Sequence, residues 1–180
     1  KLLGTNFNVI EEGLNGRTTN VNEKEEHDLG YFRPYRSAMD LLSILIETNS
    51  PLDLIVVMLG TNDLKTNFNQ SADMIAENMR LVCESIISND YFQSKSLILV
   101  APTHINENSP NLLDSFVGTT SASKSFANSY KKISDDLELI FLDASESVIT
   151  NEIDGLHWDA NQHNDFAKVV CQKIKSLFNK

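Results

Sequence analysis

Two short polar motifs in this sequence carry side chains that could perform chemistry. The tetrapeptide GTND at 60–63 follows an apolar run, and DGLH at 154–157 precedes an amphipathic segment. A carboxylate three residues before a histidine can bind the imidazole Nδ1 and hold one tautomer, which leaves the other nitrogen available as a general base. The amide of Asn62 would add a hydrogen-bond donor without a charge. Each motif alone is a weak indication, because GTND turns end many strands and D-x-x-H pairs often cap helices.

Strands and helices that alternate along the chain must position these motifs. Apolar runs predict strands near 7–14, 52–59, 96–101 and 138–142, and the run 52–59 is typical of a strand buried on both faces. Apolar stripes at helical spacing predict helices over 34–49, 71–88, 121–137 and 159–178, with Ser71 as one N-cap and a capping box formed by Asp159 and Gln162. The alternation predicts an α/β protein with a parallel sheet and a single domain over 1–180.

Two connections carry more apolar residues than a loop needs. Tyr31 and Phe32 lie in the charged loop 20–33, where they could pack against the body, line a pocket or contact another subunit. The connection 103–118 carries Leu112, Leu113 and Phe116, so we predict a partly packed flap. Ligands of open parallel sheets bind at the carboxyl ends of the strands. There we expect a pocket that includes Asn15, Thr61, His104 and Phe116.

Composition excludes several classes of function. The chain has 180 residues, 41% of them hydrophobic, and a net charge of -10, which argues against a nucleic acid or an anionic membrane as partner. No run approaches the roughly 20 apolar residues of a membrane helix. Cysteine and histidine do not cluster at metal-ligand spacing, and Cys83 and Cys171 fit buried reduced thiols. The sequence lacks a glycine-rich phosphate-binding loop, which argues against a nucleotide-binding flavodoxin-like protein.

We expect a cytoplasmic protein that acts on a small molecule, with a homo-oligomer as an open alternative. The chain starts at Lys1 without an initiator Met, so a signal peptide ahead of it stays open.

The order of the motifs is more informative than each motif. The chain presents GLNGRTT at 14–19 after a predicted strand. GTND follows the next strand, and DGLH comes before the last helix. From Asn8 to Phe178 this order resembles the SGNH hydrolases, the GDSL-type serine esterases and lipases. The sequences VIEEGLNGRTT and GTNDLK are most similar to those of the bacterial arylesterase and acyltransferase branch. The resemblance implies a flavodoxin-like, three-layer α/β/α fold.

Site roles follow from the resemblance. Gly16 matches the glycine of the second block and Asn62 the asparagine of the third. The backbone N–H of one and the side-chain amide of the other would stabilise an oxyanion, together with the N–H of the nucleophile. Asp154 and His157 match the fifth block, so His157 would be the base and Asp154 would stabilise its imidazolium. The resemblance implies no metal and no cofactor.

One part of the family pattern is absent. The first block, Gly-Asp-Ser with the nucleophile, has no counterpart, and only fifteen residues precede Gly16. We therefore expect an N-terminally incomplete domain that lacks the first, central strand of the sheet order 2-1-3-4-5. The complete protein would be a serine esterase that hydrolyses or transfers short acyl groups. The alternative is a non-catalytic module of the same fold that binds an acyl or sugar ligand.

Overall fold

Three parallel strands form the sheet of this protein. The computed structural model describes residues 2–23 and 34–178. Strands β1 (Ile55–Val57), β2 (Leu97–Ala101) and β3 (Ile140–Asp143) lie in the order β1-β2-β3. Leu99 stands opposite Val57 on one side and Phe141 on the other. The carboxyl ends of the three strands therefore meet at one edge, where the predicted motifs follow them.

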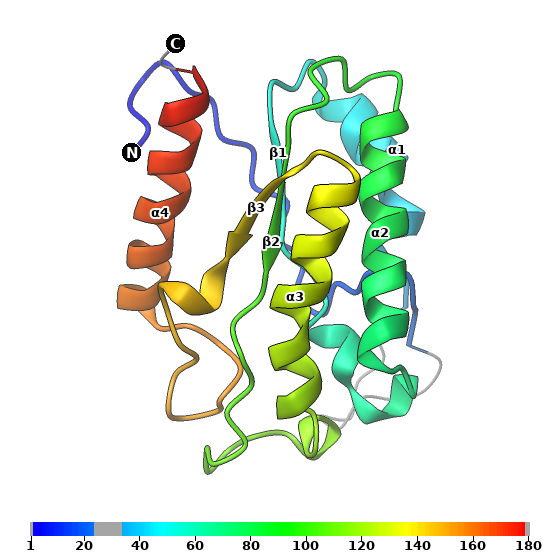
Figure 1. Ribbon diagram of the computed structural model, residues 1–180, viewed down its shortest axis with the longest axis vertical. Coiled ribbons are helices and arrows are strands. Elements are labelled where there is room, and N and C mark those ends of the chain that lie inside the picture. The colour runs from blue at the N-terminus through cyan, green and yellow to red at the C-terminus, as the bar shows by residue number, and fades with distance from the viewer. Residues whose placement is uncertain (1, 24–33, 179–180) are drawn as a thin grey trace.

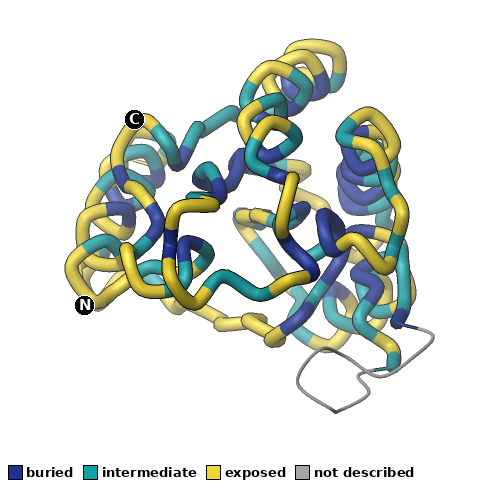
Figure 2. Tube along the Cα trace, turned by 90° about the horizontal axis from the view of Figure 1, so that it is seen from below, coloured by how far each residue is buried: buried dark blue, intermediate teal, exposed yellow. Residues whose placement is uncertain are grey.

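Helices cover the two faces of the sheet unequally. The helices α1 (Ala38–Asn49), α2 (Ala72–Ser88) and α3 (Thr120–Asp136) share one apolar core with the sheet. Helix α4 (Ala160–Phe178) contributes to a second, smaller core. Figure 1 shows α4 across the strands from α2 and α3. In end view the helices turn buried positions toward the strands and exposed positions outward (Figure 2). The predicted three-layer α/β/α class with a parallel sheet is confirmed.

Local signals fix the ends and faces of two helices. The Ser71 side chain accepts a hydrogen bond from the Met74 N–H at 3.2 Å and caps α2. Asp159 and Gln162 form the reciprocal capping box before α4, with bonds of 2.7 and 3.0 Å. The apolar stripe within 71–88 forms the buried face of α2. It consists of Ile75, Met79, Val82, Cys83 and Ile86.

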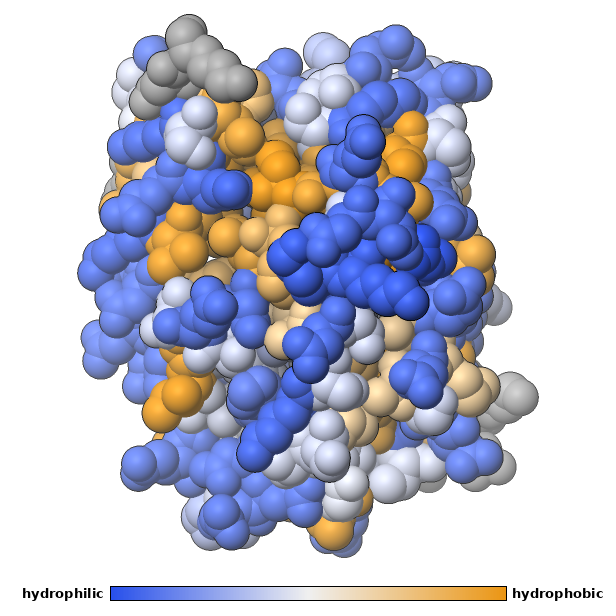
Figure 3. All heavy atoms as spheres, in the orientation of Figure 1, coloured by the Kyte–Doolittle hydropathy of each residue, from blue (hydrophilic) through white to orange (hydrophobic). Residues whose placement is uncertain are grey.

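The first strand differs from the prediction. We expected residues 52–59 to be buried on both faces, but β1 spans three residues, and Val56 and Met58 are 42% and 40% exposed. Val57 is buried against the helices of the larger core. On the opposite face, α4 packs over residues of β2 and β3, which leaves that side of β1 uncovered. In Figure 3, apolar side chains gather in the upper half of the face over the strands.

The prediction of a strand at 7–14 is wrong for the structure as described. No residue of this run belongs to a strand in the ranges 2–23 and 34–178, and Val9 and Ile10 are 63% and 42% exposed. The Phe7 ring contacts the Phe178 ring of α4 edge-on, with centroids 5.8 Å apart. A strand exists only through pairing with a neighbour, and the described residues offer this run no strand partner. The observed sheet therefore has three strands instead of four.

Helix α3 fixes the carboxyl end of β1. The buried Tyr130 hydroxyl donates a hydrogen bond to the Leu59 carbonyl at 3.0 Å. Gly60 follows with φ 119°, and a Cβ there would collide with the same hydroxyl. Glycine at this position is therefore required both by the backbone conformation and by the close approach of α3.

Replacement of the Tyr130 hydroxyl tests this anchor. Tyr130→Phe should lower the free energy of unfolding by about 0.5–1.5 kcal/mol, because the part-buried Leu59 carbonyl loses its donor. The exposed Tyr91 supplies the control Tyr91→Phe, which should change stability by less than about 0.5 kcal/mol. Urea unfolding of both variants measures the difference, and equal midpoints would contradict the anchor.

Candidate active site

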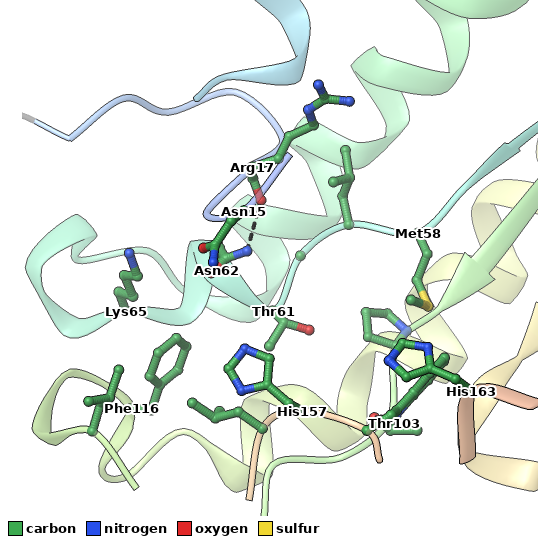
Figure 4. A pocket seen from close by; sticks show the side chains of 16 residues that line it. Asn15, Arg17, Met58, Thr61, Asn62, Lys65, Thr103, Phe116, His157 and His163 are labelled. Carbon is green, nitrogen blue, oxygen red and sulfur yellow. Dashed lines mark hydrogen bonds between the residues drawn. The ribbon is translucent and has the colours of Figure 1, made fainter. Parts of the chain in front are cut away.

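A pocket of about 350 Å³ lies at the carboxyl ends of the strands. It is lined by the turn at 15–17, the segment 58–65 after β1 and the segment 156–158 before α4. Residues 102–103 after β2, Leu113 and Phe116 of the flap, and His163 of α4 complete the lining. Figure 4 shows the His157 ring within this pocket. Phe116 and Lys65 lie to one side of it, and Met58 and His163 to the other.

Asp154 and His157 form the pair that the sequence predicts. One carboxylate oxygen accepts the backbone N–H groups of Leu156 and His157, each at 2.9 Å. The other oxygen lies 2.8 Å from His157 Nδ1. This contact occupies Nδ1, so Nε2 is the ring nitrogen that can act on a substrate. Burial alone would raise the pKa of Asp154, but these bonds outweigh it, and the pKa of the carboxyl lies below its ordinary value.

Asn151 shapes the loop that holds this pair. Its side-chain oxygen accepts the N–H groups of Ile153 and Asp154 at 2.8 and 2.9 Å. Its backbone and side-chain N–H groups both donate to the His157 carbonyl, at 2.7 and 2.9 Å. One asparagine therefore closes the loop from both ends and fixes where the histidine leaves it.

The flap predicted at 103–118 packs directly against this loop. The Asn106 N–H donates to the Gly155 carbonyl at 3.0 Å, and the Asn111 N–H donates to the Ile153 carbonyl at 3.1 Å. Gly155 has φ 68°, and a Cβ there would collide with the Asn106 carbonyl and lie 2.7 Å from Ser109 Oγ. The glycine is thus needed for contact between the two loops.

On the opposite wall, Asn62 is hydrogen-bonded to the GLNGRTT segment, which contains Gly16. The Asn62 side chain donates to the Arg17 carbonyl at 3.1 Å, drawn as the dashed line in Figure 4. Gly16 is buried with φ 78°, inside a turn closed by the Arg17 N–H and the Leu14 carbonyl at 3.1 Å. An amide nitrogen carries two hydrogens, so one Asn62 N–H remains for a pocket ligand.

The structure brings most of the predicted site residues together. Asn15, Thr61, Asn62 and His157 line one pocket. Phe116, which is 3% exposed, lines it as well. Gly16 is not among the lining residues, although both of its neighbours are.

His104 corrects the prediction. It does not line the pocket; its carbonyl accepts the Thr150 hydroxyl at 3.3 Å. A histidine that follows a strand can leave it toward either side, and the sequence does not say which. Tyr31 and Phe32 lie outside the described residues.

Comparison with solved structures places this geometry in a family. An aryl esterase from M. smegmatis superposes with a TM-score of 0.87 and 26% identity, over 98% of this chain and 82% of that chain. The carbohydrate acetylesterase Est24 from Sinorhizobium meliloti gives the same four values. A lipase/acylhydrolase from Enterococcus faecalis shares the fold at 16% identity, with a TM-score of 0.60 over 89% of this chain and 72% of that chain. The chain belongs to the SGNH hydrolase family. No protein-family model and no curated protein sequence matches it.

Several pocket residues of this SGNH hydrolase were missed by sequence reasoning. Met58, Leu156, Trp158 and His163 line the pocket. They looked like ordinary core or helix residues. The Trp158 indole N–H donates to the Thr103 hydroxyl at 2.9 Å and connects the loop after His157 to the end of β2.

A buried ion pair was also missed. Lys65 Nζ lies 2.7 Å from Glu23, and the two side chains are 3% and 1% exposed. Forty-two positions separate the partners, so no local pattern could have joined them.

Among the residues described, no group of three or more His, Cys, Asp or Glu side chains could hold a metal ion. Within the same residues, no helix has the length and apolar character needed to cross a membrane.

Gly155 and Gly118 offer a matched test of the loop contact. Both have positive φ, but a Cβ at Gly118 would meet nothing within 4 Å. Gly118→Ala should therefore cost only the backbone strain, about 1–2 kcal/mol. Gly155→Ala should cost more and shift the amide signals of both Asn106 and His157, because the alanine forces the two loops apart. Urea unfolding and amide spectra measure both effects, and equal behaviour of the two variants would contradict the contact.

Proposed function

We propose that this SGNH hydrolase is a serine esterase that hydrolyses or transfers short acyl groups through an acyl-enzyme. The observation that carries the proposal is the pairing of His157 with Asp154 at 2.8 Å in a pocket that Asn62 also lines. A base with a fixed tautomer and a neutral amide donor are what acyl transfer to a hydroxyl requires.

The proposed reaction uses these groups in sequence. His157 Nε2 takes the proton of the serine hydroxyl as its oxygen attacks the ester carbonyl. Negative charge then develops on the carbonyl oxygen, where the remaining Asn62 N–H and the Gly16 N–H donate to it. The tetrahedral intermediate collapses, and His157 gives its proton to the leaving alkoxide. Water or a second alcohol repeats the steps and releases the acyl group, while Asp154 stabilises each imidazolium.

The nucleophile of this proposal comes from a further strand. No serine or cysteine stands among the pocket-lining residues in the described part of the chain. β1 pairs with β2 on one edge, and one of its faces is uncovered. A strand at the other edge, followed by a helix over Val56 and Met58, would extend the sheet and cover the open face of β1. Such a strand would end in the Gly-Asp-Ser that the family resemblance implies, beside Gly16 and Asn62.

The size and walls of the pocket favour small apolar acyl groups. The cavity of about 350 Å³ has Leu113, Phe116 and Leu156 on the flap side. The solved relatives named above include an aryl esterase and a carbohydrate acetylesterase. A short acyl chain would fit against the flap, whereas the alcohol portion would leave through the open side of the pocket. A series of p-nitrophenyl esters of rising acyl length would show a turnover maximum at short chains.

Replacement of each site residue tests the mechanism in the complete protein. His157→Ala or Asp154→Ala should abolish most ester hydrolysis without loss of the fold. Asn62→Ala should lower kcat about 10²–10³-fold, because one oxyanion donor is lost. The histidine outside the pocket supplies the control His104→Ala, which should keep kcat within about twofold of the wild type. Near-normal turnover of His157→Ala would refute the mechanism. A protein that binds esters and hydrolyses none would support the non-catalytic alternative.

Val56 tests where the additional strand lies. In the complete protein, Val56→Lys should lower the melting temperature and abolish hydrolysis, because the docked segment would bury the new charge. In residues 1–180 alone the same change should be harmless or improve solubility. Ile44 of α1, which is 62% exposed, supplies the control Ile44→Lys, with little effect in either protein. Thermal melting and ester hydrolysis measure these effects. A fully active Val56→Lys protein would overturn the placement of the additional segment against β1.

A further inference from the structure

A fully buried carboxylate follows Asn62 directly. Asp63 is 0% exposed and lies in the short 3-10 turn η1 (Asn62–Leu64). Its two oxygens accept the Thr19 N–H at 2.9 and 3.1 Å, and one of them also accepts the Thr19 hydroxyl at 2.5 Å. All three bonds join it to a residue 44 positions away, three residues beyond Gly16.

Folding stability does not explain this carboxylate. Burial raises the pKa of Asp63 to about 6, although the bonds from Thr19 oppose the shift. A carboxyl whose pKa is higher in the folded than in the unfolded protein binds protons more tightly when folded. Its ionisation therefore costs stability as the pH rises from about 4 to about 6, and the full cost persists at neutral pH. Tyr130 of α3 lies near it, and the pKa of Tyr130 lies well above its ordinary value, chiefly through burial and also through the Asp63 charge.

The segment that Asp63 holds is fixed on its other side by α1. The Thr18 N–H donates to the Arg36 carbonyl, and the Ala38 N–H donates to the Thr18 carbonyl, both at 3.0 Å. The Met39 N–H donates to the Thr19 carbonyl at 3.2 Å. Residues 18–19 therefore lie between the start of α1 and η1. The Asp63 bonds hold Thr19 to η1, and the Asn62–Arg17 bond holds the preceding residue to the same turn.

We propose that Asp63 is a positioning residue that sets the distance between the Gly16 N–H and the Asn62 amide. This inference rests on the proposed function, in which those two groups donate to the oxyanion. Asp63 does not touch the substrate. It acts through Thr19, which holds the glycine turn, and through its own backbone, which carries Asn62. A displacement of about 1 Å in such a constellation can lower turnover about 10²-fold.

The chemistry of the contact explains why a carboxylate is needed. One Asp63 oxygen accepts both the Thr19 N–H and the Thr19 hydroxyl, and the other oxygen also accepts the N–H. In Asp63→Asn the side-chain NH₂ group would face either the Thr19 N–H or its hydroxyl, and one acceptor would be replaced by a donor. The Thr19 segment would then move away from η1, although the size of the side chain is unchanged.

Four variants of the complete protein test the proposal. Asp63→Asn and Thr19→Val should each lower kcat about 10–10²-fold with KM changed less than about threefold, because the transition state loses stabilisation that the bound substrate does not use. Thr19→Ser keeps the hydroxyl and should retain kcat within about threefold. The exposed Asp53 supplies the control Asp53→Asn, which removes the same charge and should leave kcat unchanged. Unchanged kcat in Thr19→Val would overturn the proposal, even if Asp63→Asn fails to fold.

A second measurement separates this inference from the proposed function. The Thr19 amide proton should titrate with an apparent pKa of about 6 in the wild type and in His157→Ala, and should lose that titration in Asp63→Asn. Absence of esterase activity in the wild type, with this titration present, would reject the proposed function and leave the Asp63–Thr19 contact intact. An active wild type in which Asp63→Asn leaves the Thr19 amide signal unchanged would reject the positioning role alone.

Discussion

The rest of this structure depends on how β1 pairs with its neighbouring strand and on what packs against its two faces. The strand joins the sheet through β2, and its buried face rests on the helices of the larger core. Its end carries the GTND turn, so the position of Asn62 and of Asp63 depends on how firmly β1 is held. Tyr130 fixes that end from α3. The opposite face, with Val56 and Met58, is open, and the proposed strand and helix would complete the sheet and the active site together.

The two halves of the site are stabilised in different ways. Asp154 and His157 sit on a short loop that closes on itself through Asn151 and is supported by the flap. The proposed oxyanion donors instead lie on segments about 45 positions apart, joined by the Asn62–Arg17 and Asp63–Thr19 bonds. A change in the flap should therefore affect the proposed base, whereas a change in η1 should affect the proposed oxyanion donors. This division makes the two contributions separable by mutation.

Features set by local interactions were predictable from the sequence, and features set by distant partners were not. Ser71 and the Asp159–Gln162 capping box predict where α2 and α4 begin, because a cap is made by residues three apart. The Asp154–His157 pair is equally local. The run at 7–14 has strand composition, but its pairing depends on a partner that the sequence cannot place, and the prediction was wrong. The same reason hid the Asp63–Thr19 and Glu23–Lys65 contacts, and the direction of His104 depended on packing.

Mapping of the nucleophile tests the central claim most directly. The complete protein would be inactivated with a p-nitrophenyl phosphonate, digested and analysed by peptide mass spectrometry. The His157→Ala variant would be treated in the same way as the control. The account predicts one phosphonylated serine, in a Gly-Asp-Ser sequence on a segment other than residues 1–180, and no label in His157→Ala. A labelled serine within residues 1–180, or equal labelling of His157→Ala, would contradict it.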